Sequence, residues 1–269
     1  MPNLTAPQTT LIEDRFQGIP DVAHGGYVAG ALAAALDTDS VEVQLRRPIP
    51  TGCPLDLKFD GETLELRDGE ALLARASRTA LQIETPSPVS FAEAEMAARD
   101  FIGADQHPIP GCLVCGTHRH RGDGLRIFPG PVAGRGLVAA PWVPDTTFAD
   151  DAGHVPGALA SAALDCTQLW ALIAHAPPGI PDKVVTASLE LSLGAPVLAG
   201  EPHVVLGWPI GRDGRSWLAG AAVVGPGGEI CALGRQRAAI TDWGVPLGFR
   251  PTATPSQNHS QKGEDHEPR

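Results

Sequence analysis

The chain has 269 residues, of which 43% are hydrophobic and 19% are charged, and its formal net charge is −11 at pH 7. These fractions are typical of a globular protein with a buried core. The negative balance argues against DNA or RNA as a partner, because binding to the phosphate backbone needs basic surface. No run approaches the ~18 apolar residues of a membrane-spanning helix, and no leader pattern opens the chain, so we expect a cytoplasmic protein that binds neither nucleic acid nor membrane.

Residues 1–84 carry the pattern of a loop, a buried helix and then several strands. An extended segment at residues 10–12 precedes a loop that contains His24, Gly25 and Gly26. The Ala- and Leu-rich run that follows, residues 27–36, has little polar surface, which predicts a buried helix. Apolar and polar residues then alternate, as in half-buried strands. The alternating segments are residues 41–45, 55–59 and 63–66.

Residues 85–134 form a predicted linker. Prolines flank a short helical pattern at residues 91–101, and the segment 111–131 is loop-like and contains two cysteines. Residues 135–249 then repeat the earlier order of helix and strands. We expect a helix at residues 155–174 and strands at residues 136–143, 184–193, 203–209, 217–224 and 229–240. The polar tail, residues 250–269, is predicted to be disordered.

The two helix-and-strand parts are copies of each other. Residues 28–35 return at residues 155–162, an offset of 127, and the strand segments that follow match at offsets of 148 and then 159. The growing offsets place the extra residues of the second copy in surface connections, where insertions are tolerated. Two copies are too few for a solenoid. We therefore expect two homologous halves packed on each other as an internal pseudo-dimer.

One long apolar helix wrapped by an antiparallel sheet, twice over, resembles a double hotdog. The expected fold class is therefore α+β, with two antiparallel sheets that each wrap a long central helix. The turn at His24, Gly25 and Gly26 resembles the His-Gly-Gly turn that opens the central helix in hotdog acyl-CoA thioesterases. Glycines let a ligand approach the backbone, and the N–H groups of a helix N-terminus favour a phosphate or an oxyanion. The alternative is a tight turn beneath a closely packed helix.

Three polar residues of the second half resemble the Asp, Thr and Gln constellation of the acyl-CoA thioesterase II family. Asp165 lies in the apolar run of the second helix, Thr186 opens the next strand ten residues before a proline, and Gln236 lies in the last strand. The first half has no such set. The alternatives are a helix-surface Asp165, an ordinary strand threonine and a solvent-facing glutamine.

The resemblance implies hydrolysis of acyl-CoA thioesters to free acid and CoA, with no cofactor. Asp165 would accept a proton from a water that Thr186 and Gln236 hold, and backbone N–H groups at a helix start would stabilise the oxyanion. Two other readings stay open: a hotdog that binds an acyl ligand without turnover, and an enoyl-CoA hydratase, for which Asp150 and His154 offer a superficial pair. Arg235 and Arg237 are candidates for contact with CoA phosphates. The double-hotdog protomers could also form a homo-oligomer.

The cysteines are five and scattered, at positions 53, 112, 115, 166 and 231, which fits a reducing compartment better than a disulfide framework. Cys112 and Cys115 lie within nine residues of His118 and His120, and zinc favours these residue types. A lone Cys-x-x-Cys is a weak signal, because structural zinc sites usually draw their second ligand pair from farther away. We therefore expect a loop without metal here.

Overall fold

The computed structural model describes residues 8–175 and 184–240, so the predicted disordered tail lies outside the described residues. The helices are α1 (Gly25–Ala35), α2 (Phe91–Ala98) and α3 (Gly157–His175). The strands are β1 (Gln8–Leu11), β2 (Ser40–Leu45), β3 (Pro54–Phe59), β4 (Thr63–Asp68), β5 (Ala71–Arg78), β6 (Gly130–Pro131), β7 (Val138–Trp142), β8 (Val184–Leu193), β9 (His203–Asp213), β10 (Ser216–Val224) and β11 (Ile230–Ile240). These bounds agree closely with the predicted helices and strands.

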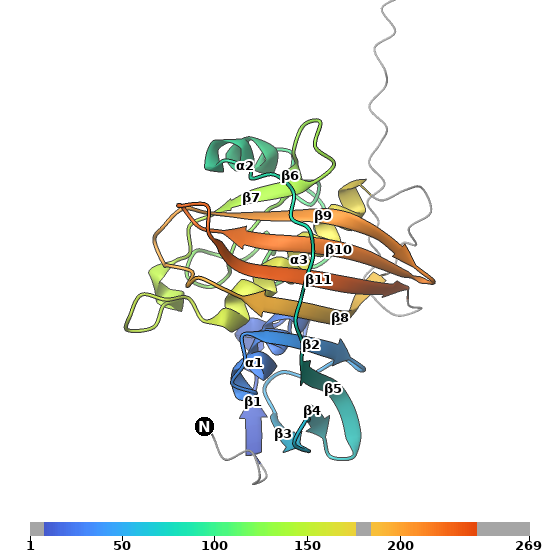
Figure 1. The fold of residues 1–269 in the computed structure, drawn as a ribbon. Helices are drawn as coiled ribbons and strands as arrows, with labels where there is room; N and C mark the ends of the chain where they lie inside the picture. The colour runs from blue at the N-terminus through green and yellow to red at the C-terminus, as the bar shows by residue number, and fades with distance from the viewer. Residues whose placement is uncertain (1–7, 176–183, 241–269) are drawn as a thin grey trace, which may run out of the picture.

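The strands form one continuous antiparallel sheet rather than the two separate sheets that we expected. Its order is β1-β3-β4-β5-β2-β8-β11-β10-β9-β7-β6 (Figure 1). The two halves meet where β2 pairs with β8. An edge strand with unpaired backbone groups tends to recruit another strand, and here each half satisfies the edge of the other. The antiparallel sheet and its apolar helices fit a hotdog fold.

The join between the halves lies on a local two-fold axis. Glu42 pairs with Glu190 across β2 and β8, and these two residues are equivalent in the sequence repeat at its offset of 148. From this pair outward the strand order is symmetric, with β5, β4, β3 and β1 matched by β11, β10, β9 and β7. The duplication read from the sequence is therefore also a symmetry of the sheet.

The two apolar helices pack directly against each other, and α1 needs glycine at the contact. A Cβ built on Gly30 would lie 2.5 Å from the Cα of Ala158, and one built on Gly26 would lie 2.6 Å from the Ser161 carbonyl oxygen. Neither distance is possible for real atoms. Since residue 26 faces residue 161 and residue 30 faces residue 158, the helices run antiparallel, as a two-fold relation requires.

Helix α3 is the central helix of the core. It packs against α1 and against β9, β10 and β11, and its residues from Leu159 to Gln168 are all buried. By length and composition it could cross a membrane, but most of it is buried inside the protein, as in any core helix. Its burial carries Asp165 into the interior.

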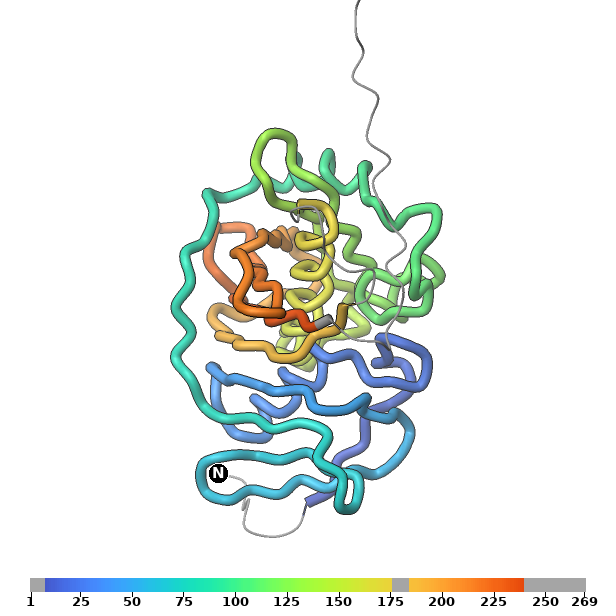
Figure 2. The backbone as a smooth tube through the Cα atoms, turned by 90° about the vertical axis from the view of Figure 1, so that its right-hand side faces the viewer, coloured from blue at the N-terminus to red at the C-terminus, as the bar shows by residue number. Residues whose placement is uncertain are grey.

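The chain crosses between the halves on the side of the sheet away from α3. After β5 the teal trace in Figures 1 and 2 runs over the sheet to α2, which packs on β7. Residues 82–86 on this path lie beside Trp208, Ile210 and Arg235. The chain then returns through residues 99–129 to the α3 side. The division into residues 1–84, 85–134 and 135–249 stays a prediction.

Candidate active site

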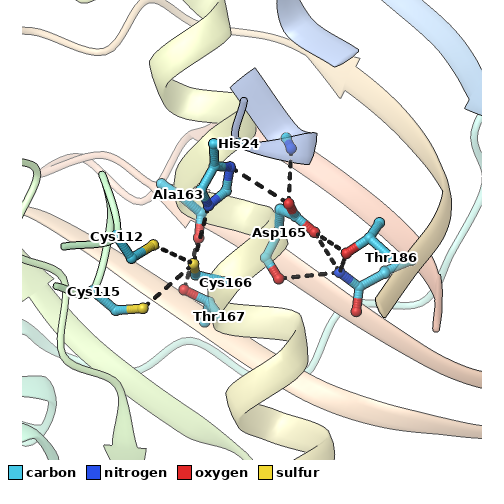
Figure 3. A network of polar contacts seen from close by, with 10 residues as sticks. His24, Cys112, Cys115, Ala163, Asp165, Cys166, Thr167 and Thr186 are labelled. Atoms are coloured by element: carbon cyan, nitrogen blue, oxygen red, sulfur yellow. Dashed lines mark hydrogen bonds and ion pairs between the residues drawn. The ribbon is translucent and has the colours of Figure 1, made fainter. Parts of the chain in front are cut away.

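Asp165 is the only buried carboxylate in the described part of the chain, with 4% of its surface exposed. Its Oδ2 accepts a hydrogen bond from the backbone N–H of Gly26 at 2.7 Å. Its Oδ1 accepts one from the Thr186 hydroxyl at 2.7 Å and one from Gln236 Nε2 at 2.5 Å. The donors lie on α1, β8 and β11. The predicted trio of Asp165, Thr186 and Gln236 therefore converges from α3, β8 and β11, and Figure 3 shows Thr186 beside Asp165. A surface position for Asp165 is thereby excluded.

A β-bulge brings Thr186 and Gln236 to the same face of the sheet. Gln236 pairs with Leu189, but Ala238 pairs with Thr186, so β8 has one extra residue between the two positions. Because side chains alternate along a strand, Thr186 and Leu189 would otherwise point to opposite faces. The bulge turns the Thr186 hydroxyl inward, where Gln236 Nε2 lies 3.0 Å from it.

His24 is the N-cap residue of α1 and lies 4% exposed between Asp165 and a group of cysteines. Its Nδ1 lies 3.5 Å from Asp165 Oδ2, and its Nε2 lies 3.1 Å from the sulfur of Cys166. Burial lowers the pKa of His24, but the neighbouring Cys112 and Asp165 together raise it above its ordinary value. His24 is therefore part of two clusters at once.

The His-Gly-Gly turn packs closely beneath α3, as one of its two interpretations from sequence expected, and its role in ligand binding stays a prediction. Gly26 allows the close contact between α1 and α3, and its N–H is occupied by Asp165. Gly25 is the first residue of α1, and an N–H at that position has no acceptor within the helix. Gly25 also lines a cavity.

The cavity has a volume of about 350 Å³ and lies at the boundary of the two halves. Asp165 and Thr186 line it together with Gly25 and mostly apolar side chains. Arg46 and Arg47, which follow β2, also line it. We did not expect these two residues from the sequence. An adjacent arginine pair at the end of a predicted strand was the available signal.

The other predicted candidates lie elsewhere. Both oxygens of the Glu190 carboxylate bind Arg235, and Asp213 binds Arg237, so neither arginine is free to bind phosphate without losing its partner. Asp150 is exposed and its Oδ1 accepts the backbone N–H of His154 at 2.8 Å. That carboxylate holds a surface turn rather than a hydratase site.

The predicted group of Cys112, Cys115, His118 and His120 is split by the structure. Cys112 and Cys115 are buried, but His118 and His120 are exposed. The two cysteines instead face Cys166 on α3 (Figure 3). The sequence analysis missed Cys166 because it lies 51 residues beyond Cys115, although it directly follows Asp165.

Comparison with known proteins finds likeness in structure only. No family model matches the chain, and no curated protein matches it in sequence. Among solved structures, the chain is similar to the tesB protein of Mycobacterium avium subspecies paratuberculosis, with 14% identity and a TM-score of 0.51 over 87% of this chain and 93% of that one. It is also similar to a candidate thioesterase II from Thermobifida fusca YX, with 13% identity and a TM-score of 0.52 over 87% and 92%. The likeness shows that the chain shares the fold of these thioesterase II proteins.

Proposed function

We propose that the protein hydrolyses acyl-CoA thioesters in the cytoplasm, with Asp165 as the general base. The observation that carries the proposal is a single buried carboxylate that borders a cavity and is oriented by donors from three elements. Convergence of polar groups at an otherwise apolar cavity is the usual arrangement of an active site. The shared fold with thioesterase II proteins is consistent with this chemistry.

The proposed reaction needs no covalent intermediate. An ionised carboxylate has about four acceptor positions, and the three donors leave one, on Oδ2. His24 Nδ1 lies 3.5 Å from this oxygen without a hydrogen bond to it, so the position is open to a water in the cavity. Asp165 takes a proton from this water as its oxygen attacks the thioester carbon. The N–H of Gly25 stabilises the oxyanion that forms. When the carbon–sulfur bond breaks, Asp165 returns the proton to the CoA thiolate, and the free acid leaves.

Thr186 and Gln236 orient both the carboxylate and the water. The Thr186 hydroxyl donates to Asp165 and accepts from Gln236 Nε2, which fixes its direction. Gln236 Oε1 is buried and has no hydrogen-bond partner among the described residues. An unpaired buried acceptor is costly, so it favours a bound water that donates to it.

Arg46 and Arg47 give the cavity its preference for a CoA ester. Both are exposed at its mouth, while the interior is mainly apolar. Guanidinium groups bind phosphate oxygens in pairs of parallel hydrogen bonds. The CoA phosphates would therefore bind outside and the acyl chain inside, with the thioester near Gly25 and Asp165.

The decisive experiment replaces Asp165 by asparagine, in which an amide nitrogen takes the place of one carboxylate oxygen. Purified protein is offered a panel of acyl-CoA esters, and released CoA is measured with a thiol reagent. Asp165→Asn keeps the size of the side chain but cannot act as a base, so we expect kcat to fall by about 10²–10⁴-fold. The matched control is Asp151→Asn, an exposed carboxylate in a surface turn, which should leave kcat unchanged. Equal rates for wild type and Asp165→Asn on every ester would reject hydrolysis.

One observation favours the second candidate, an acyl-CoA binding protein without turnover. Three of the acceptor positions of Asp165 are filled by protein donors, as in a carboxylate whose role is to hold α1, β8 and β11 together. In that case the wild-type protein releases no CoA but binds a non-hydrolysable analogue of acyl-CoA, an S-alkyl-CoA thioether that lacks the carbonyl group. CoA release therefore separates the two candidates, and calorimetric titration with this analogue shows that a protein without CoA release still binds the ligand.

A further inference from the structure

Four potential metal ligands from three separate segments converge beside the candidate active site. Cys166 Sγ lies 3.6 Å from Cys112 Sγ, 3.5 Å from Cys115 Sγ and 3.1 Å from His24 Nε2. The ligand atoms of His24, Cys112 and Cys166 all lie within 4.8 Å of one another. All four side chains are buried, and in Figure 3 His24, Cys112 and Cys115 all point toward the sulfur of Cys166.

The spacing is that of ligands around one tetrahedral ion. With Zn–S near 2.3 Å and Zn–N near 2.0–2.1 Å, tetrahedral angles place two sulfurs about 3.8 Å apart and a sulfur about 3.6 Å from a nitrogen. The three distances from Cys166 are slightly shorter. Cys115 does not belong to the group of ligand atoms that all lie within 4.8 Å of one another, so its sulfur moves toward the other three ligands when the ion binds. A disulfide requires sulfurs about 2.0 Å apart, and all three cysteines are free.

The outer contacts of the cluster also fit a metal site. A histidine that binds zinc through one ring nitrogen usually donates the other N–H to a carboxylate, which fixes the orientation of the ring. His24 Nε2 faces the sulfurs, and its Nδ1 faces Asp165 Oδ2 at 3.5 Å. Nδ1 makes no hydrogen bond with any described residue.

We propose that the protein binds one structural Zn²⁺ through His24 Nε2 and the sulfurs of Cys112, Cys115 and Cys166. Binding exchanges three protons of the neutral ligand set for the ion, which leaves a site of net charge −1. Four protein ligands close the coordination sphere, and a closed sphere is the mark of a structural rather than a catalytic zinc. The site differs from the one considered from sequence, because His118 and His120 are replaced by His24 and Cys166.

The zinc would link three segments of the chain that are not joined to one another by strand pairing. His24 caps α1, Cys112 and Cys115 lie in the long segment between the halves, and Cys166 lies on α3. The ion would also fix the orientation of the His24 ring beside Asp165, so His24 would belong to both the metal site and the candidate active site. The proposal does not depend on hydrolysis, since metal content is measured without substrate.

The first test is the zinc content of the full-length protein. The protein is purified without chelators or a metal-affinity tag, and metals are measured by inductively coupled plasma mass spectrometry. We expect one zinc per chain in wild type, and a fall to near zero in Cys112→Ser, Cys115→Ser and Cys166→Ser. Matched controls that should keep the zinc are Cys53→Ser, Cys231→Ser and the double variant His118→Ala/His120→Ala. Wild type without stoichiometric zinc, or with another metal in its place, would overturn the proposal.

A second measurement tests the site in the wild-type protein and therefore does not depend on whether the cysteine variants fold. Wild type is grown in medium with Co²⁺ in place of zinc, and its absorption spectrum is recorded. Tetrahedral thiolate coordination gives intense visible bands and a near-ultraviolet charge-transfer band, whereas octahedral Co²⁺ is almost colourless. A colourless cobalt protein would reject the site. Thr186→Val should keep its zinc even though its hydrolysis is slower, so that the failure of one proposal is distinguishable from the failure of the other.

Discussion

Asp165 owes its position to residues that are far from it in sequence. Its three donors come from residues 26, 186 and 236. Burial of an unpaired carboxylate is strongly unfavourable, so the donors are needed for the fold to accept the charge at all. The same donors fix both oxygens in space, which leaves one acceptor position directed to the cavity. Stability and positioning therefore depend on the same contacts.

A substitution of Thr186 can test how far the position of Asp165 depends on its donors, because valine keeps the size of the side chain and removes its hydroxyl. Thr186→Val leaves Asp165 Oδ1 and Gln236 Nε2 without their shared partner, and a small displacement of a reacting group costs about 10²-fold in rate. We expect kcat to fall by about that factor with little change in KM, while Thr186→Ser stays within a few-fold of wild type. Steady-state kinetics of both variants on one acyl-CoA ester provide the measurement. Equal kcat values for Val and Ser would contradict a role for the hydroxyl.

At the scale of elements, the contact between α1 and α3 controls how closely the two halves approach. Gly26 and Gly30 have no room for a Cβ, and the obstructing atoms are mostly backbone atoms and the Asp165 Cβ of α3. Backbone cannot rotate away as a flexible side chain can. The antiparallel helix pair therefore depends on glycine every fourth residue along one face of α1, and this contact brings the Gly26 N–H to Asp165.

Gly30→Ala is expected to destabilise the protein although alanine is the better helix former. The gain in helix propensity is about 1 kcal/mol, whereas overpacking a rigid site costs roughly 1–3 kcal/mol and more when only backbone can move. We expect a net loss of about 1–2 kcal/mol, seen as a Tm lower by about 2–8 °C. The control is Gly111→Ala, where the nearest atom to the new Cβ is a flexible glutamine nitrogen at 3.6 Å. A Gly30→Ala protein as stable as this control would contradict the close helix contact.

At the scale of the whole molecule, the local parts of the fold could be predicted and the long-range contacts could not. Alternation and apolar runs report the environment of neighbouring residues, so the helix expected at residues 27–36 is found at Gly25–Ala35. The pairing of β2 with β8 joins residues that are far apart in sequence, 148 residues in the case of Glu42 and Glu190, and no local pattern encodes it. For that reason one continuous sheet replaces the two that we expected.

The same difference between local patterns and long-range contacts explains which residues of the candidate site could be predicted. Asp165, Thr186 and Gln236 could be named from their order and spacing, because a resemblance preserves both. The sequence pattern places His24 only in a glycine turn and Cys166 only among five scattered cysteines, so neither residue is predicted as a metal ligand. Their meeting requires the fold, since the zinc ligands at residues 24, 112 and 166 come from α1, the connecting segment and α3. The ligand types were visible in the sequence, but the grouping was not.

Removal of the metal should loosen the molecule locally while the sheet stays folded. Binding to the native state alone stabilises a protein, but here a large core holds the sheet without help from the ion. We therefore expect treatment with a strong chelator and a reductant to lower Tm by several degrees, and one equivalent of Zn²⁺, but not Mg²⁺, to restore it. Hydrogen exchange should rise around residues 109–127 and at the start of α1, and stay slow in β8, β10 and β11, because local opening affects only the units that lose contacts. Cys53→Ser, which leaves all four ligands in place, is the control that should respond like wild type. Identical Tm and exchange before and after metal removal would show that nothing in the fold depends on the ion.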